Sequence, residues 1–518
     1  MLPTEPTDEA FGLGERTSST VSVSVHKISS LSLCCNMVLS MTGTAVLGVG
    51  SQMKTYGWIL TPISLVLAVI LSAEMVWVVS ATSQKIEDET GLEIVAYQDF
   101  AEAALGRGGW WASSISSVLS LVCFIIGGII LEAQNLQIVA PIHWSSPLGG
   151  TSTEQGEQWW KLFLTATTLF YCFVDIGQLL HGSGFIGVGL TIFVMTSVYI
   201  GMFGQFGSVD SFNPACDNSD DGVPYHSLGL NNDGSQGFQS FLDVFSVSSY
   251  MVFTFAIVVT LPTLRSTMRR KEDLYKMSSI AFAIVAALFI IVMLAYYWVF
   301  GNLGPDNIID GMRMGRDDDL PGWWATVNPW HAGKPTIVGQ ILSWGVTFHL
   351  LCSDAIYVPV AVVSIEKLLP SHWVGRKRVW ITLRLFVSFM RWFIGSVVTD
   401  FVTFSNLTSA AFLTLNNNVL PILCFYHAGP KERAGTLKRT GHLIILVFST
   451  LLIIFGTINA VQQLVAKSED AGTFPRAHIS VECQEAFCKL NSSNQKWRNA
   501  FYRSCKQPYD LTNETIFF

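Results

Sequence analysis

The amino-acid sequence predicts an all-α polytopic membrane protein that crosses the bilayer about eleven times. Only 13% of its 518 residues are charged, roughly half of the ~25% that is usual in soluble domains, whereas 50% are hydrophobic. Aromatic residues reach 12%, which suits a lipid-facing surface anchored at the membrane interfaces. The apolar residues also gather in long runs. Such runs must be helical in lipid, where the backbone finds no other hydrogen-bond partner.

The apolar runs have the length that a membrane-crossing helix needs, about 20 residues. A large soluble protein with buried helices is the alternative, but the stretch from Ile280 to Phe300 carries no charge, which disfavours it. The eleven expected spans are 31–53, 57–81, 112–140, 159–180, 182–206, 240–262, 277–300, 336–363, 379–401, 404–427 and 441–463. We therefore expect a tail over residues 1–30, one eleven-helix domain over 31–463 and a second tail over 464–518.

The loops set the expected orientation, because cytoplasmic loops are enriched in Lys and Arg. The first 30 residues are polar and contain no signal-peptide pattern, so we expect them to form a cytoplasmic tail. With that end inside, the basic loops after the sixth, eighth and tenth spans face the cytoplasm, and the acidic loop over 207–239 faces outside. An odd number of spans then places the C-terminal tail on the extracellular or luminal side.

The C-terminal tail carries features of an extracellular or luminal segment. Two N-glycosylation sequons begin at Asn491 and Asn513. Four cysteines fall on the same expected side and are candidates for two disulfides, with the pairing left open: Cys216, Cys483, Cys488 and Cys505. These patterns agree with the charge bias of the loops, so we expect the tail to lie outside.

Several function classes are disfavoured by composition and motifs. The formal net charge of −7 and the lack of a long basic run argue against nucleic-acid binding. Nucleophile-elbow, zinc-protease and phosphate-loop motifs are missing from the sequence, as are Cys and His spaced for a metal. We therefore expect no enzyme activity, no metal and no organic cofactor. The expected partners are membrane lipids and a small-molecule substrate.

Small and hydroxyl-bearing residues interrupt the first span. Thr42, Gly43, Thr44 and Ala45 lie in mid-span, where they can loosen a helix and free peptide groups to meet a polar solute. Close packing of two helices through small residues explains the same pattern. Periodicity by itself favours close packing over a loosened helix.

Ionisable residues also lie inside the expected spans. A charge at the bilayer centre costs about 2.5–3.5 kcal/mol, so such residues usually face the helix bundle and a partner. Asp354 in the eighth span and Arg391 in the ninth fall at similar expected depth, which predicts an ion pair of either structural or working significance. Glu132 lies nearer the outer end of the third span, where solvation at the interface would also explain it.

Five segments resemble the amino acid/auxin permease family in order and spacing. They are Thr42 to Gly50 followed by Gly57-Trp58; Leu261-Pro262 before a basic loop; Phe300-Gly301-Asn302 followed by Asp306 to Ile309; Pro359 before Glu366; and Asn418 to Pro421. The likeness runs through roughly residues 30 to 463 and includes the number of spans. The sequence is therefore identified as similar to this family of eleven-helix secondary transporters.

The resemblance implies the LeuT-like fold, in which spans one to five and six to ten are inverted repeats and an eleventh helix is added. Substrate would bind at the bilayer midplane between two broken helices. The positions that would contribute are Thr42, Gly43, Thr44 and Ala45 in the first span and Phe253, Thr254 and Ala256 in the sixth. The sixth span lacks the Gly, His or internal Pro that often marks its break, which leaves the substrate class open.

The coupling ion implied by the resemblance is a proton in preference to sodium. Leu39 stands where sodium-coupled relatives carry an Asn, and Cys352 replaces a hydroxyl in the eighth span, with Ser353 beside it. Asp354 is then the first candidate for the proton carrier, and Ser353, Glu132 and Arg391 complete the expected ion-coupling residues.

The function that follows is secondary active transport of amino acids or similar small zwitterions by alternating access, with proton coupling. Another organic solute on the same fold and a non-transporting amino-acid sensor are the alternatives. A plasma membrane and the membrane of an acidic organelle both fit the expected topology. The sequence carries no signal for the oligomeric state.

Overall fold

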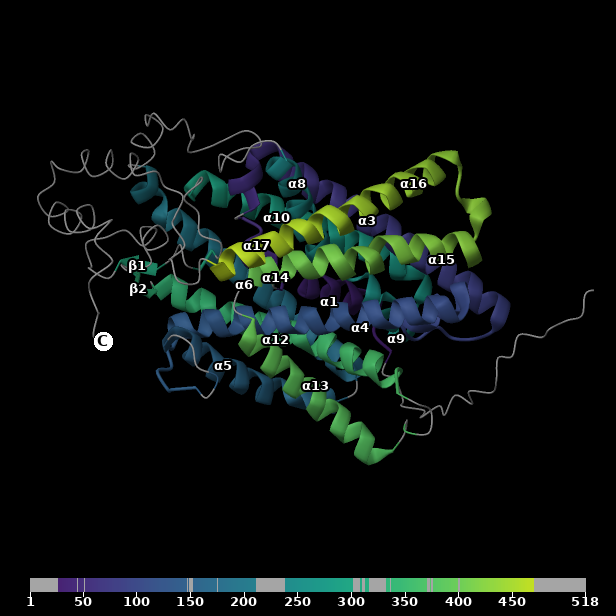
Figure 1. Ribbon diagram of the computed structural model, residues 1–518, viewed down its shortest axis with the longest axis horizontal. Coiled ribbons are helices and arrows are strands. Elements are labelled where there is room, and N and C mark those ends of the chain that lie inside the picture. Colours follow the sequence, from purple (N-terminus) through teal and green to yellow (C-terminus); the bar gives the residue numbers. More distant parts are fainter. Residues whose placement is uncertain are drawn as a thin grey trace, which may run out of the picture.

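A computed structural model describes residues 27–469, apart from 44, 51, 147, 149–151, 175, 211–237, 301–307, 310–312, 316–331, 336, 370–372, 374–375 and 399–400. Thr44, the sequons at Asn491 and Asn513 and the four candidate disulfide cysteines lie outside these residues. Long helices run side by side, with α4 across the middle of the view, α5 and α13 below it, and α14 and α16 above it (Figure 1).

The described residues are mostly α-helical. The α-helices are α1 (Ser30–Thr42), α2 (Ala45–Gly48), α3 (Gln52–Thr90), α4 (Tyr97–Val139), α5 (Ser152–Thr168), α6 (Ile176–Asp210), α8 (Phe238–Thr254), α9 (Leu261–Thr267), α10 (Leu274–Phe300), α12 (Ile337–Glu366), α13 (Lys377–Val397), α14 (Phe401–Thr408), α15 (Leu420–Ala428), α16 (Thr436–Leu451) and α17 (Thr457–Glu469). The 3-10 helices are η1 (Leu169–Cys172), η2 (Val258–Thr260), η3 (Lys271–Asp273) and η9 (Lys431–Arg433). The π-helical segments are η7 (Ser409–Leu413), η8 (Leu415–Val419) and η10 (Leu452–Gly456), and the strands are β1 (Arg313–Gly315) and β2 (Ala332–Pro335).

The helical fold predicted from the sequence is confirmed. Within the described residues, 9 helices are long and apolar enough to cross a membrane. The two remaining expected spans correspond to the interrupted pair α1 and α2 and to α5 with η1. The antiparallel hairpin of β1 and β2, which the sequence did not predict, lies between α10 and α12.

Two glycines mark where long helices turn before they enter the bundle. Gly57 in α3 and Gly106 in α4 have φ of 68° and 69°, a left-handed conformation that favours glycine. The membrane-crossing part of α3 begins at Gly57, as expected. In α4, a short segment begins at Tyr97 and ends at Gly106, and the expected span over 112–140 follows this glycine.

The centre of the bundle consists of α1, α4, α6, α10 and α12. Helix α12 packs against α6 and α4, and α1 packs against α6 and α10. Large apolar side chains point outward from the outer faces of the helices; Ile186 and Ile192 on α6 are 62% and 64% exposed. A soluble protein rarely exposes so many apolar side chains together, so this outer surface is suited to lipid.

The turn between α2 and α3 depends on a glycine that a neighbouring aromatic ring covers. A Cβ atom added at Gly50 would lie 2.5 Å from Cγ and 2.9 Å from Cβ of Tyr296, a buried residue of α10. These atoms are at the root of the Tyr296 side chain and cannot move away without a shift of α10.

Gly50→Ala should therefore destabilise the protein by about 1–3 kcal/mol, the usual cost of overpacking a core. The measurement is the thermal unfolding midpoint in detergent. Gly189→Ala is the matched control, because an added Cβ there meets no atom within 4 Å. Equal midpoints for the two variants would contradict this account.

Candidate functional site

The first membrane span is interrupted in its middle. Helix α1 ends at Thr42, Gly43 follows with φ −47° and ψ −92°, and α2 begins at Ala45. Gly43 lies against α12, because a Cβ added there would be 3.2 Å from Oγ of Ser353 and 3.4 Å from Cδ2 of Leu350. The structure thus brings two residues from different expected sites, Gly43 and Ser353, into proximity.

The sixth span is interrupted as well, although it lacks the residues that often mark a break. Helix α8 ends at Thr254, the next three residues are non-helical, and the chain continues through η2 into α9. Pro262 stands in the first turn of α9. Backbone N–H groups in the first turn have no hydrogen-bond partner within the helix, so the missing N–H of proline costs no hydrogen bond there. This proline lies after the interruption and favours a fresh helix start there.

The two interruptions are connected by one buried side chain. The hydroxyl of Tyr250 on α8 donates a hydrogen bond to the carbonyl of Ala45 in α2, at 3.3 Å. The same ring covers Gly48, where a Cβ would collide with the Tyr250 hydroxyl. Thr254 at the end of α8 donates to the Tyr250 carbonyl at 3.0 Å. Tyr250 therefore joins Ala45 of the first span to the end of α8, which carries Phe253 and Thr254.

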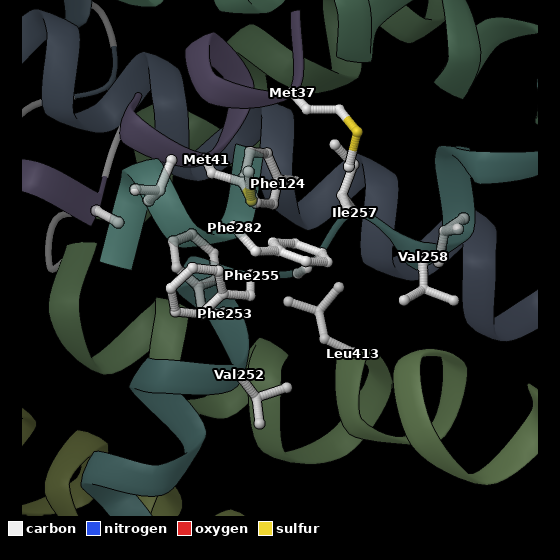
Figure 2. Close-up of a cluster of buried hydrophobic side chains, with 14 of the residues drawn as sticks. Met37, Met41, Phe124, Val252, Phe253, Phe255, Ile257, Val258, Phe282 and Leu413 are labelled. Carbon is white, nitrogen blue, oxygen red and sulfur yellow. The ribbon is translucent and has the colours of Figure 1, made fainter. Parts of the chain in front are cut away.

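An apolar aromatic layer lies at this region. The ring of Phe253 stacks on Phe124 of α4, with centroids 5.0 Å apart, and Phe124 lies 4.2 Å from Tyr357 of α12. Figure 2 shows Met41 and Phe124 together with Phe253 and Phe255 around the interrupted sixth span. Helices α4 and α12 thus reach the interruption through their aromatic side chains.

A polar triad holds the end of α1 to its neighbours. Nε2 of His349 on α12 lies 3.2 Å from Oγ1 of Thr42 and 2.8 Å from Oγ1 of Thr191 on α6. Each threonine hydroxyl already donates its single proton to a backbone carbonyl, of Val38 and of Gly187 respectively. The ring nitrogen must therefore be the donor to one or both hydroxyls, so His349 holds the end of α1 against α6 and α12.

A charged cluster is buried between α4, α12 and α13. Arg391 forms the ion pair with Asp354 that the sequence predicted, and its Nη2 atom lies 3.8 Å from Oε2 of Glu132. Its other nitrogens donate to Thr168 Oγ1 at 2.8 Å and to the Ile125 carbonyl at 3.1 Å. Arg391 thus connects three spans.

Glu132 does not lie at the solvated interface that the sequence offered as one explanation. Its side chain is 0% exposed, and Asp354 and Arg391 are 5% and 2% exposed. On α12, Ser353 lies against Gly43 of the first interruption, while the adjacent Asp354 pairs with Arg391. Helix α12 therefore links the interruption to the charged cluster. The ion-coupling roles of these residues remain predictions.

The sequence analysis missed a polar network on the tenth span. Asn416 in the π-helical segment η8 donates to Ser120 at 2.9 Å, accepts from Ser116 at 2.7 Å, and its carbonyl accepts from Tyr97 at 2.6 Å. Its neighbour Asn417 is buried, with no hydrogen-bond partner for its amide among the described residues. Three consecutive Asn residues in an apolar run were the available signal.

Comparisons with known proteins agree with this geometry. A family model described as "Transmembrane amino acid transporter protein" matches residues 26–462. The sequence matched no curated protein. Among solved structures, MhsT in complex with L-phenylalanine matches with a TM-score of 0.51 and 13% identity, covering 83% of this chain and 98% of that one. A substrate-bound, outward-open Na⁺-coupled sialic acid symporter matches with a TM-score of 0.47 and 11% identity, covering 87% and 91%. The first of these shows that the chain has the LeuT-like fold.

Removal of Arg391 should be strongly destabilising, because it leaves two buried carboxylates without their cation. We expect Arg391→Gln to cost about 3–5 kcal/mol, the usual result of breaking a buried ion pair. Thermal unfolding in detergent measures the effect. The control is Arg378→Gln on the exposed start of α13, expected within about 0.5 kcal/mol of the unsubstituted protein. A similar small effect for Arg391→Gln would show that the cluster does not need its arginine.

Proposed function

The chain belongs to the transmembrane amino acid transporter protein family, and from this premise we propose that it is a secondary active transporter of amino acids or similar small zwitterions. The observation that carries the proposal is the pair of interrupted spans joined by Tyr250. Non-helical backbone in a membrane protein is tolerated where it is buried in protein or faces a polar solute, and paired interruptions are typical of transporter binding sites.

The substrate would bind between the two interruptions that Tyr250 joins, near Thr42, Gly43 and Ala45 of the first span and Phe253, Thr254 and Ala256 of the sixth. Helices α1 and α8 both end there, and the carbonyl ends of helices attract a cation such as an ammonium group. The aromatic layer of Phe253 and Phe124 would contact the substrate side chain. The L-phenylalanine bound to MhsT supports an amino acid as the substrate.

Transport would proceed by alternating access. A substrate held between the α1–α2 and α8–α9 interruptions is exposed to one side or the other as these spans move against α4 and α12. The polar triad of Thr42, Thr191 and His349 would fix the end of α1 to α6 and α12 in one of the two states.

We favour a proton over sodium as the coupling ion. Leu39, at the position where sodium-coupled relatives carry an Asn, is fully buried against Gly187 of α6, so it places hydrocarbon where an oxygen ligand would be needed. The carboxylates of Glu132 and Asp354 supply groups that can take up and release a proton within the bundle.

The proposed orientation has the N-terminus in the cytoplasm and the C-terminal tail outside or in a lumen. Basic residues flanking the spans pair with acids at the end of α3, in the loop after it and at the start of α4: Arg265 with Glu87 at 2.6 Å, Lys271 with Glu93 at 2.6 Å, and Lys367 with Asp99. These pairs gather the basic segments at one end of the bundle, which supports assigning that end to the cytoplasm. A plasma membrane or an acidic organelle would supply a proton excess on the opposite side.

Uptake of labelled amino acids into proteoliposomes tests the proposal. We expect accumulation that follows an imposed inward pH gradient and does not need sodium. Accumulation driven by sodium would keep the transporter and overturn the choice of ion. With correctly folded protein, failure of every amino acid under both gradients would favour another organic solute or a sensor.

The aromatic layer gives a prediction for substrate affinity. Phe253→Ala removes the stacking on Phe124 and should raise KM for an apolar amino acid about tenfold, since loss of about 1.4 kcal/mol of contact suffices for that factor. Initial uptake rates measure KM. Phe389→Ala is the control, because Phe389 is 52% exposed on the outer surface of α13. An unchanged KM for the Phe253 variant would remove this residue from the site.

A further inference from the structure

The buried charges of the cluster do not balance. Glu132 and Asp354 are two carboxylates, and among the described residues Arg391 is the one guanidinium that pairs with them. Arg391 donates hydrogen bonds to Asp354, to Thr168 and to the carbonyl of Ile125. Neither oxygen of Glu132 has a hydrogen-bond partner among the described residues, although its side chain is 0% exposed. With both acids ionised, the cluster would hold one excess negative charge.

The simplest way to remove this excess charge is to add a proton to Glu132. An ionised carboxylate buried without hydrogen bonds costs several kcal/mol, whereas a carboxylic acid costs far less. A metal cation is a poor alternative, because it would sit beside Arg391, whose positive charge lies 3.8 Å from Glu132. The other titratable groups that face the cluster among the described residues are Tyr171 and Cys172 in η1 and Cys352 on α12.

Helix α5 offers a polar route to this cluster. Its buried face carries, at helical spacing, Glu157, Gln158, Lys161, Thr165 and Thr168. The outward face carries apolar side chains, and Leu162 and Phe163 are 37% and 41% exposed. This arrangement reverses that of a soluble amphipathic helix, in which polar groups face outward.

The polar face of α5 leads from the loop after α4 to the charged cluster. Lys161 pairs with Glu157 one turn before it, at 3.7 Å, and Thr168 accepts a hydrogen bond from Arg391. Between them, the Thr165 hydroxyl is buried and has no hydrogen-bond partner among the described residues. The stretch from Glu157 to Thr168 spans about 16 Å at 1.5 Å per residue. Helix α5 packs against α4 and α13, which carry Glu132 and Arg391.

We propose that Glu132 carries the coupling proton and that the buried polar face of α5, from Glu157 to Thr168, is its route to water on the side where α4 ends. This deepens the proposed function and rests on it. It assigns the proton to Glu132 in place of Asp354, which Arg391 neutralises directly.

The position of Glu132 explains how its charge acts on the substrate region. Phe124 lies eight residues before it on the same helix, about 12 Å away along the axis. Asp354 lies one turn before Tyr357, whose ring meets Phe124. Arg391 donates to the carbonyl of Ile125, next to Phe124. Loss of the proton charges a cluster that is built on the same α4 and α12 helices as the aromatic layer.

Glu132→Gln tests the assignment, because glutamine mimics the protonated acid but cannot release a proton. With one proton per substrate, a pH gradient of about one unit sustains about tenfold accumulation, since each unit corresponds to 1.36 kcal/mol. We expect the variant to lose this accumulation and the accompanying proton flux, read with a trapped pH dye, while exchange of labelled for unlabelled substrate at equal pH persists.

Glu74→Gln is the matched control. Glu74 is a half-buried carboxylate of α3 that pairs with Lys438 and His442 of α16, away from the cluster. The Glu74→Gln variant should accumulate substrate as the unsubstituted protein does. Glu132→Gln protein that accumulates substrate about tenfold under the same gradient would overturn the assignment.

The outcomes separate this inference from the proposed function. If the unsubstituted protein accumulates an amino acid with sodium in place of protons, the inference fails and the transporter stands. If it neither accumulates nor exchanges amino acids, both fail.

The route itself has a second test, which also applies if Glu132→Gln does not fold. Thr165→Val should slow pH-driven uptake about tenfold, a barrier increase of about 1.4 kcal/mol, and Thr165→Ser should restore it. Exchange at equal pH should persist in both variants. Equal pH-driven rates for the valine and serine variants would overturn the route and the proposal with it.

Discussion

The structure depends on one constraint: a peptide group within a membrane must find its hydrogen-bond partner inside the protein. Continuous helices meet this requirement along most of the chain. At the two interruptions the helical partners are lost, and side chains take over part of their role. Tyr250 donates to the carbonyl of Ala45, and the fold covers the first interruption with α6, α10 and α12 and the second with α3, α4 and η8. The surrounding helices are positioned so that they shield the peptide groups of the interruptions from lipid.

The second determinant is the way in which buried charge joins helices far apart in the sequence. Arg391 contacts α4 through Ile125, α12 through Asp354 and the end of α5 through Thr168. These contacts lock the spans around the interruptions into one arrangement, and a shift of any of them disturbs the others. A charged cluster of this kind contributes little net stability compared with apolar packing of the same volume, so its main structural effect is to fix which helices meet.

The sequence predicted the spans well, because a run of about 20 apolar residues is close to a sufficient condition for a membrane helix. The Asp354–Arg391 pair was also predictable from depth along the helices. The interruption after Thr254 was not marked by Gly or Pro within it, and Glu132 gave no sign of its depth. The fourth span was expected over 159–180, but α5 covers Ser152–Thr168. Polar residues such as Glu157 and Lys161 lower the hydropathy of its first turns, although they face inward.

The polar inner face of α5 has a consequence for how the protein is made. A helix that carries Glu157 and Lys161 has a reduced tendency to leave the translocation channel for lipid by itself, because each charge within a span adds to the cost of insertion, by up to about 2.5–3.5 kcal/mol at the bilayer centre. Glu157 and Lys161 pair with each other on α5, and the end of the helix is held by Arg391 of α13, which donates to Thr168 and is synthesised more than 200 residues later. Helix α5 is therefore expected to stay beside α4 until α13 has been synthesised. The helices of this chain would then not enter the membrane independently, one after another.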